Sequence, residues 1–299
     1  MASEAIAGRM NHTGSPAIAC IISAYQLPRQ LVRLVSRLQS PRRTFYVHVD
    51  LKTPTSVYDE MAAGLVVHDN VHLLTRHACH WGGFGHVEAT LKGLARIADA
   101  GTPCDYVVLL TGQDYPIKSN ACLDAFFAAR QGQSFMNHRP LPIAAFPDGG
   151  YGRLRRRHVV FRGAVRALPS LPWLPDSWAR RVPYGLHPHF GSGYWCLHRS
   201  AVEYVVEFLR THPGYVRFFQ HAYVPDEMFF QTILLNSPLA PTIVNDDVRL
   251  IKWPGPAVLT SADVEDLAAS PDLFARKFDE RVDTVVLDRI DRELIAWPA

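Results

Sequence analysis

The stretch Ala17-Ile-Ala-Cys-Ile-Ile-Ser-Ala-Tyr25 decides the fold class, because it is a continuous apolar run that contains β-branched residues. Such a run predicts a strand buried on both faces of a sheet. Apolar residues then recur at helical spacing at Leu31, Leu34 and Leu38, so a helix follows the strand. Further strands are predicted at 45–50, 71–75 and 106–110, with a helix at 87–97. This alternation predicts an α/β protein with a mainly parallel central sheet flanked by helices.

Length and composition are those of a globular protein. With 299 residues, the chain can form one large α/β domain or two small ones, and we expect one domain over residues 17–299. Residues 1–16 are small and polar and predict a flexible tail. Residues from about 140 to 188 are rich in Pro, Arg and Gly, have little periodicity, and predict a long basic loop insertion.

The cysteines and the N-terminal region predict a cytoplasmic location. The five cysteines are odd in number and show no spacing typical of disulfides, which suits a reducing compartment. The longest apolar run near the N-terminus, 17–25, is shorter than the roughly 20 residues that span a bilayer. It also lacks the basic start and the cleavage site of a signal peptide.

Positive charge is concentrated in the predicted insertion. Between Tyr151 and Arg181 a single acid, Asp176, accompanies eight arginines: Arg153, Arg155, Arg156, Arg157, Arg162, Arg166, Arg180 and Arg181. Such a run is either a solvated face or a surface for an anionic partner, such as phospholipid headgroups, a lipid-diphosphate-linked glycan or an acidic polysaccharide. Trp173 and Trp178 favour peripheral contact with the inner membrane face through Arg153–Arg181. Nucleic acid is not expected, because no recognition motif accompanies the arginines.

Two short segments carry candidate chemistry. Val224-Pro-Asp-Glu-Met-Phe-Phe-Gln-Thr232 begins a predicted helix with a proline and two carboxylates. Ordinary helix-start chemistry explains this pattern, and so does a catalytic base at Glu227, with Asp226 as the competing base or the helix cap. Asp272-Leu-Phe-Ala-Arg-Lys-Phe-Asp279 sets two cations between aromatic residues, which is typical of either a surface basic pair or an anion clamp.

Four more segments complete a resemblance that runs in order from about residue 17 to residue 280. They are Phe45-Tyr-Val-His-Val-Asp50, Trp81-Gly-Gly83, Leu109-Leu-Thr-Gly-Gln-Asp-Tyr-Pro-Ile-Lys-Ser119 and Phe190-Gly-Ser-Gly-Tyr-Trp-Cys-Leu-His-Arg199. Together the six segments resemble glycosyltransferase family 14, which holds the core-2/I-branching β-1,6-N-acetylglucosaminyltransferases and the peptide O-xylosyltransferases. The resemblance implies a GT-A-like nucleotide-diphospho-sugar transferase fold. Eukaryotic relatives are Golgi enzymes with an N-terminal membrane anchor, so the resemblance implies a bacterial-type member without one.

The resemblance also implies a set of site residues. Glu227 matches the catalytic base, Arg276 and Lys277 match the pair that binds the diphosphate, and the donor side is completed by Asp50, Trp81 and Ser23. The acceptor side is implied at Asp114, Ser192, Tyr194 and Asp226.

Two departures from the family pattern concern the acceptor strand and the diphosphate site. Gly193 and Tyr194 follow Ser192, where family members often carry Gln or Asp and then Trp. An arginine that holds diphosphate in the branching enzymes has no counterpart near residues 254–257. The phosphate-binding side therefore resembles the xylosyltransferases more closely. Trp81, taken without the resemblance, is equally well explained as a core aromatic.

No metal and no cofactor are expected. His48-Val-Asp50 stands where many glycosyltransferases carry two aspartates, but one carboxylate and one imidazole are a poor site for a hard cation. The 14 histidines show no spacing typical of metal ligands.

These observations favour a metal-independent, inverting glycosyltransferase that moves a sugar from a UDP-sugar to a hydroxyl of a glycan or glycolipid acceptor. The product would be a β-linkage, with N-acetylglucosamine favoured as the sugar. One alternative is a UDP-xylose-dependent O-xylosyltransferase, and another is a non-catalytic nucleotide-sugar or glycan-binding protein of the same fold. A membrane-surface adaptor that uses the arginine segment is a third.

Overall fold

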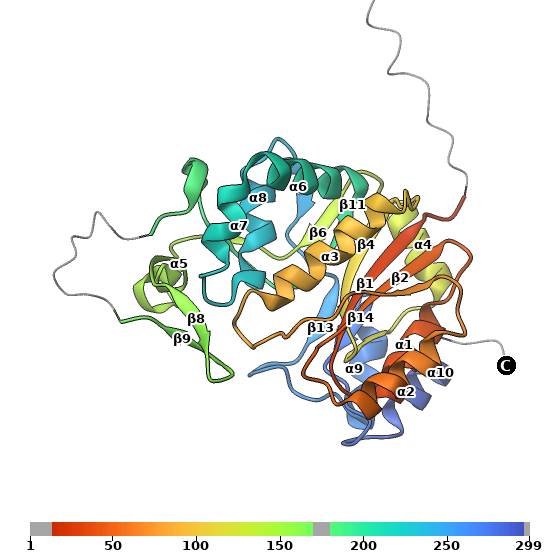
Figure 1. Cartoon of the computed structure of the whole chain (residues 1–299). Helices are drawn as coiled ribbons and strands as arrows, with labels where there is room; N and C mark the ends of the chain where they lie inside the picture. The colour runs from red at the N-terminus through yellow and green to blue at the C-terminus, as the bar shows by residue number, and fades with distance from the viewer. Residues whose placement is uncertain (1–13, 170–179, 296–299) are drawn as a thin grey trace, which may run out of the picture.

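The computed structural model describes residues 14–169 and 180–295, and its centre is a seven-stranded sheet (Figure 1). The strand order is β12-β6-β11-β4-β1-β2-β3. These strands are β1 (Ile18–Ala24), β2 (Arg43–Val49), β3 (Val71–Leu73), β4 (Tyr106–Thr111), β6 (Ser134–Met136), β11 (Trp195–His198) and β12 (Ile243–Val244). Only β11 runs antiparallel to its neighbours β4 and β6. The predicted α/β fold with a mainly parallel sheet is confirmed.

Helices cover both faces of this sheet, because each central strand buries apolar side chains on both sides (Figure 1). In β1, Ile18, Cys20 and Ile22 belong to one core cluster, whereas Ala19 and Ile21 belong to the other. The first cluster also contains residues of α1 (Pro28–Leu38), α2 (Thr55–Leu65), α4 (Asn120–Ala128), α9 (Val264–Ala269) and α10 (Val286–Glu293). The second contains residues of α3 (Gly85–Asp99), α6 (Arg199–Thr211), α7 (Pro213–Phe219) and α8 (Phe229–Leu235).

A second, three-stranded sheet lies beyond the end of β4. It consists of β13 (Arg249–Ile251), β14 (Phe274–Arg276) and β5 (Asp114–Pro116). In its register Arg276 pairs with both Ile251 and Asp114. This small sheet therefore joins the Thr-Gly-Gln-Asp turn after β4 to the predicted cation pair.

The predicted basic insertion has more regular structure than expected. It contains β7 (Arg139–Pro140), the 3₁₀ turns η1 (Pro147–Gly150) and η3 (Pro183–Gly185), the short helix α5 (Gly152–Arg155) and a hairpin of β8 (His158–Phe161) and β9 (Ala164–Ala167). A two-residue turn joins the hairpin strands, with Arg162 and Gly163 at φ 49° and 78°. The prediction of a loop was wrong for residues 158–167, which form this hairpin. The sequence signal was weak, because the turn is Arg-Gly, whereas two-residue hairpin turns usually carry Asn-Gly or Asp-Gly.

Some predictions fall on the parts of the chain left out of the description. Most of the 1–16 tail, Trp173, Asp176 and Trp178 lie outside the described residues. All five cysteines are described and are free. Among the helices of the described ranges, none combines the length and the hydropathy needed to cross a bilayer.

Candidate active site

The segment with the two carboxylates folds as a tight turn before a helix. Pro225–Glu227 form the 3₁₀ turn η4, and α8 begins only at Phe229. The expectation that Asp226 caps the helix was wrong, because Val224 and Met228 occupy the two N-cap positions and no side chain caps either element. The helix starts later because the turn closes on itself, with the Glu227 N–H donating to the Val224 carbonyl (3.3 Å).

Glu227 presents its carboxylate to an arginine of the basic insertion. Arg153 Nη1 lies 2.6 Å from Glu227 Oε2, and the two side chains keep 26% and 31% of their surface exposed. The Arg153 guanidinium also lies over the rings of Phe190 (4.8 Å) and Phe146 (5.3 Å). Burial and the neighbouring Asp226 raise the pKa of Glu227, while Arg153 opposes this rise.

Asp226 lies deeper than its neighbour. Its Oδ1 is buried and has no hydrogen-bond partner within the described part of the chain. Burial raises the pKa of Asp226 to about 6. The adjacent carboxyl groups thus differ in environment: Glu227 is paired with a cation, whereas Asp226 Oδ1 has no partner among the described residues.

The segment before β11 packs against this turn. The Gly191 N–H donates to the Glu227 carbonyl (2.8 Å), and a Cβ on Gly193 would lie 3.2 Å from Asp226 Oδ2. Gln231 of α8 donates to the Ser192 carbonyl (2.6 Å). Ser192 and Gly193 are therefore held directly beside the two carboxylates.

Tyr194 connects this turn to the cation pair. Its ring lies 4.2 Å from the Arg276 guanidinium and 4.5 Å from the Arg249 guanidinium. Arg276 is only 8% exposed, so it is not part of a free surface pair. Lys277 is half-buried, and its side chain has no ion pair among the described residues. The nearby Lys277 ammonium helps to lower the pKa of the Asp279 carboxyl group.

Asp114 is placed differently from the expectation of a substrate contact. Its side chain is fully buried, and its Oδ1 lies 3.3 Å from Arg249 Nε and 3.7 Å from Arg276 Nε. Its other oxygen accepts a hydrogen bond from the Thr111 N–H. A carboxylate enclosed in this way holds the arginines in position and, in this structure, does not reach an acceptor.

The residues predicted for the donor side lie at the carboxyl ends of the central strands. Ser23 of β1 is in register with His48 of β2 and Thr111 of β4, and Asp50 follows β2 directly. Asp50 Oδ1 accepts a hydrogen bond from the Lys52 N–H (2.9 Å). This edge is where open α/β sheets bind their ligands.

Trp81 lies on the surface, because 75% of it is exposed, so the alternative of a core aromatic is wrong. Its ring meets Tyr223 edge-on at 5.7 Å. Gly82, at φ 75°, accepts a hydrogen bond at its carbonyl from the Val224 N–H (2.8 Å). The Trp-Gly-Gly turn is thereby attached to the residue that begins the Glu227 turn.

Three side chains of types that can bind a metal lie close together in the structure, although their spacing in the sequence did not predict a metal site. The donor atoms of His48, His77 and Cys79 lie within 4.8 Å of one another. Imidazole and thiol suit zinc, whereas the magnesium and manganese of nucleotide chemistry prefer oxygen ligands. His77 is also engaged already, with ring nitrogens 2.8 Å from the Gly85 carbonyl and 2.9 Å from Lys92 Nζ. These residues do not fit an ion that bridges a diphosphate.

Two residues of this site were missed in the sequence. Arg249 has a fully buried side chain in β13, where a strand pattern predicts apolar residues, and it donates to the Leu109 carbonyl (3.0 Å). Arg153 is one of many arginines in its segment, and nothing local distinguishes it. Arg249 lies beside Arg276, because both guanidinium groups face the Asp114 carboxylate.

Comparisons with known proteins show the family of this chain. Residues 18–269 match the model of the Core-2/I-Branching enzyme family. Xylosyltransferase 2 of Rattus norvegicus and that of Homo sapiens are each 27% identical over 292 residues, which cover 89% of this chain and 32% of the relative. Xylosyltransferase 1 of Rattus norvegicus is 26% identical over 297 residues, which cover 91% of this chain and 34% of that protein. This chain thus spans about a third of the length of these curated relatives. With a family match over most of its length, the chain belongs to the Core-2/I-branching enzyme family of glycosyltransferases, which has a GT-A-like fold.

Proposed function

We propose that this protein is a metal-independent, inverting glycosyltransferase that moves a sugar from a UDP-sugar to a hydroxyl of a glycan or glycolipid acceptor, forming a β-linkage. The observation that carries this proposal is the segment 191–194, which joins the Glu227 turn to Arg276. The Gly191 N–H donates to the Glu227 carbonyl. Gly193 approaches Asp226 beside Glu227, and the Tyr194 ring lies against Arg276. A base for the acceptor and cations for the leaving group are thereby supported by one short segment.

Glu227 is the proposed general base. An inverting transfer requires a group that removes the proton of the acceptor hydroxyl as the oxygen attacks the anomeric carbon. Of the two neighbouring carboxylates, Glu227 is the one that has a charged partner, Arg153, at 2.6 Å. Asp226, Ser192 and Tyr194 are proposed to shape the acceptor side around it.

Arg276 and Lys277 are the proposed clamp for the diphosphate. The leaving UDP gains negative charge in the transition state, and fixed cations stabilise it without reorganisation. Arg249 and Asp114 lie behind Arg276 and are proposed as positioning residues. Asp50, Ser23 and Trp81 are proposed to bind the rest of the donor, and Lys52 beside Asp50 would repel a metal ion placed there.

Two donor sugars remain in the proposal. The sequence favours UDP-N-acetylglucosamine. UDP-xylose is the second candidate, because the relatives reported above carry the name xylosyltransferase and because the Phe-Ala-Arg-Lys-Phe segment resembles that branch.

The proposed function is tested by UDP release over a panel of UDP-sugars, with and without EDTA. We expect UDP release from one of the two candidate donors, undiminished by the chelator. Complete loss with EDTA and recovery with manganese would overturn the metal-independent mechanism. Absence of release or transfer with every donor, despite measurable UDP binding, would support the non-catalytic alternative.

Replacing Glu227 should affect turnover but not the binding of UDP. In Glu227→Gln we expect turnover to fall by about 10²–10⁴-fold, with UDP affinity unchanged, because the base acts on the acceptor. Kinetics and calorimetry measure the two quantities. Asp226→Asn is the matched variant, and the assignment is wrong if this variant loses turnover while Glu227→Gln remains active.

Arg153 should set the lower pH limit of activity. Its guanidinium opposes the burial-driven rise in the pKa of Glu227, so Arg153→Gln should raise that pKa further. The base works only when deprotonated, and activity is lost as the pH falls through the pKa. The acid limb of kcat/KM against pH should therefore move to higher pH. Arg166 is an exposed arginine of the same insertion, so Arg166→Gln should leave the acid limb unchanged. An acid limb that is unchanged in both variants would contradict the role of Arg153.

The clamp should bind phosphate rather than nucleoside. A charge-assisted hydrogen bond contributes about 1.5–3 kcal/mol, so Arg276→Ala and Lys277→Ala should each weaken UDP binding by about ten- to a hundredfold. Uridine has no phosphate and should bind both variants as it binds the parent protein. Isothermal calorimetry with both ligands measures the difference.

Arg281→Ala is the control for the clamp, because Arg281 lies four residues beyond Lys277 on the surface and pairs with Asp279. Its UDP affinity should be unchanged. Equal losses for UDP and uridine in a clamp variant would indicate a folding defect, and unchanged UDP affinity in both would remove the clamp from the mechanism.

A further inference from the structure

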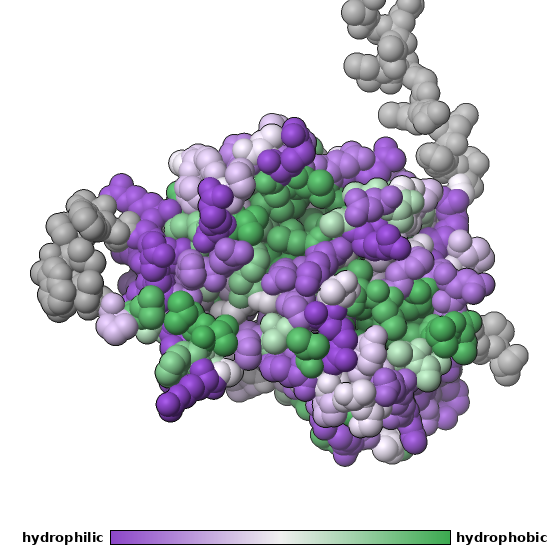
Figure 2. All heavy atoms as spheres, viewed as in Figure 1, coloured by the Kyte–Doolittle hydropathy of each residue, from purple (hydrophilic) through white to green (hydrophobic). Residues whose placement is uncertain are grey.

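The β8–β9 hairpin projects from the body of the protein and carries apolar side chains that the fold leaves exposed. Figure 1 shows the hairpin at one edge of the molecule, away from the central sheet, and Figure 2 shows an apolar patch over it beside hydrophilic residues. Phe161 is 59% exposed, and Leu168, just after β9, is 44% exposed. Exposed apolar residues gathered in one place indicate a binding surface more often than scattered ones do.

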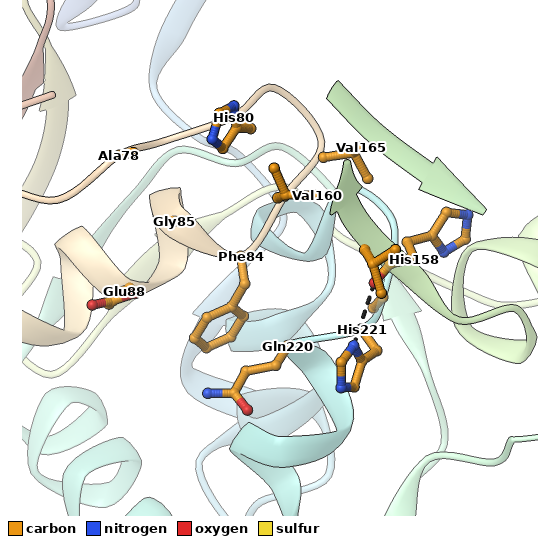
Figure 3. Close-up of a pocket in the computed structure, with 13 residues that line it drawn as sticks. Ala78, His80, Phe84, Gly85, Glu88, His158, Val160, Val165, Gln220 and His221 are labelled. Carbon is orange, nitrogen blue, oxygen red and sulfur yellow. Dashed lines mark hydrogen bonds between the residues drawn. The ribbon is translucent and has the colours of Figure 1, made fainter. Parts of the chain in front are cut away.

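The inner side of the hairpin is occupied by the protein itself. Val160 and Val165 form a cross-strand pair and line a cavity of about 300 Å³ together with Gln220 and with Phe84, the residue before α3 (Figure 3). Hydrogen bonds hold the hairpin at both ends: His80 Nδ1 lies 3.0 Å from the Gly163 carbonyl, and the His158 N–H donates to the His221 carbonyl (2.9 Å). The hairpin is thus a supported projection, and its outer side is free to meet a partner.

Strand alternation places Phe161 and Arg166 on the side opposite to the Val160–Val165 pair. Arg162, at the hairpin tip, lies with its guanidinium 5.4 Å from the Phe161 ring. The exposed arginines of this region are Arg155, Arg156, Arg157, Arg162 and Arg166, and none of them forms an ion pair with any residue in 14–169 or 180–295. Arg162 and Arg166 therefore place positive charge beside the apolar Phe161, and neither forms an ion pair with a described residue.

We propose that the outer side of the β8–β9 hairpin binds an anionic lipid bilayer, with Phe161 entering the interface and the arginines contacting the headgroups. Charge complementarity alone would also suit an acidic polysaccharide. Such a polymer has no apolar phase, however, and would leave Phe161 and Leu168 in water. A membrane interface accommodates both kinds of side chain, since apolar rings enter the acyl boundary while guanidinium groups remain among the phosphates.

This inference does not depend on the transfer reaction, but the hairpin is connected to the proposed site. His158 stacks on Tyr223 at 5.1 Å, and Tyr223 meets Trp81 edge-on. The next residue along the chain, Val224, begins the Glu227 turn. A bilayer bound at the hairpin would therefore lie on the side of the molecule that carries Arg153 and the acceptor strand, which is the side a lipid-linked acceptor needs.

Vesicle flotation of the full chain tests the proposal. We expect binding to vesicles of phosphatidylcholine mixed with phosphatidylglycerol, little binding to phosphatidylcholine alone, and weaker binding at high salt. Phe161→Ser should lower binding on the order of tenfold or more, since it removes a large apolar side chain from the interface. Arg162→Gln should lower binding less, and only to the anionic vesicles.

Two matched variants lie elsewhere on the surface. Val66, at the end of α2, is 77% exposed, and Arg96 is an exposed residue of α3. Val66→Ser and Arg96→Gln should bind vesicles as the parent protein does, and UDP affinity should be the same in all four variants, which shows that each is folded. Equal vesicle binding by Phe161→Ser and the parent protein would overturn the proposal. Retention on dextran sulfate without vesicle binding, indifferent to Phe161→Ser, would also overturn it in favour of an acidic polymer.

Discussion

A buried group of charges links the proposed donor and acceptor sides of this protein. The carboxylate of Asp114 is enclosed between the guanidinium groups of Arg249 and Arg276, and the Tyr194 ring lies against both arginines. Removing an ion from water costs several kcal/mol, so the group is stable only because its members compensate one another. Two guanidinium groups face the one Asp114 carboxylate, which agrees with the proposal that Arg276 takes part in binding a diphosphate.

The same group constrains the backbone around it. Arg276 is fixed by the pairing of β14 with β5 and β13, and Tyr194 leads directly into the central sheet at Trp195. Ser192 and Gly193 cannot move far, because Gln231 and the Glu227 turn hold them from the other side. The proposed base and the proposed clamp are therefore parts of one packed unit. Their relative position is set by backbone pairing rather than by loops alone.

The arginines of the basic insertion have two different positions, one beside the proposed base and one on the exposed hairpin. Arg153 turns inward, between two aromatic rings and against Glu227, and it affects the protonation of the proposed base. The arginines of the hairpin turn outward and remain without ion pairs in the part of the chain that the structure describes. Arginines of the same segment therefore lie in two environments. Arg153 packs against aromatic rings and Glu227, whereas the hairpin arginines are exposed.

The sequence by itself determined the main strands and helices of the central sheet and the candidate residues of the site. The apolar run at 17–25 and the helical spacing after it predicted the parallel sheet, since a strand covered on both faces must be apolar throughout. The motif around Glu227 and the Arg276–Lys277 pair were found because their residue types are unusual together. Only the tertiary structure decided which groups meet. Arg249, Arg153 and the enclosure of Asp114 depend on contacts between segments far apart in the chain, and a buried arginine or a withdrawn carboxylate leaves no local pattern from which such contacts can be predicted.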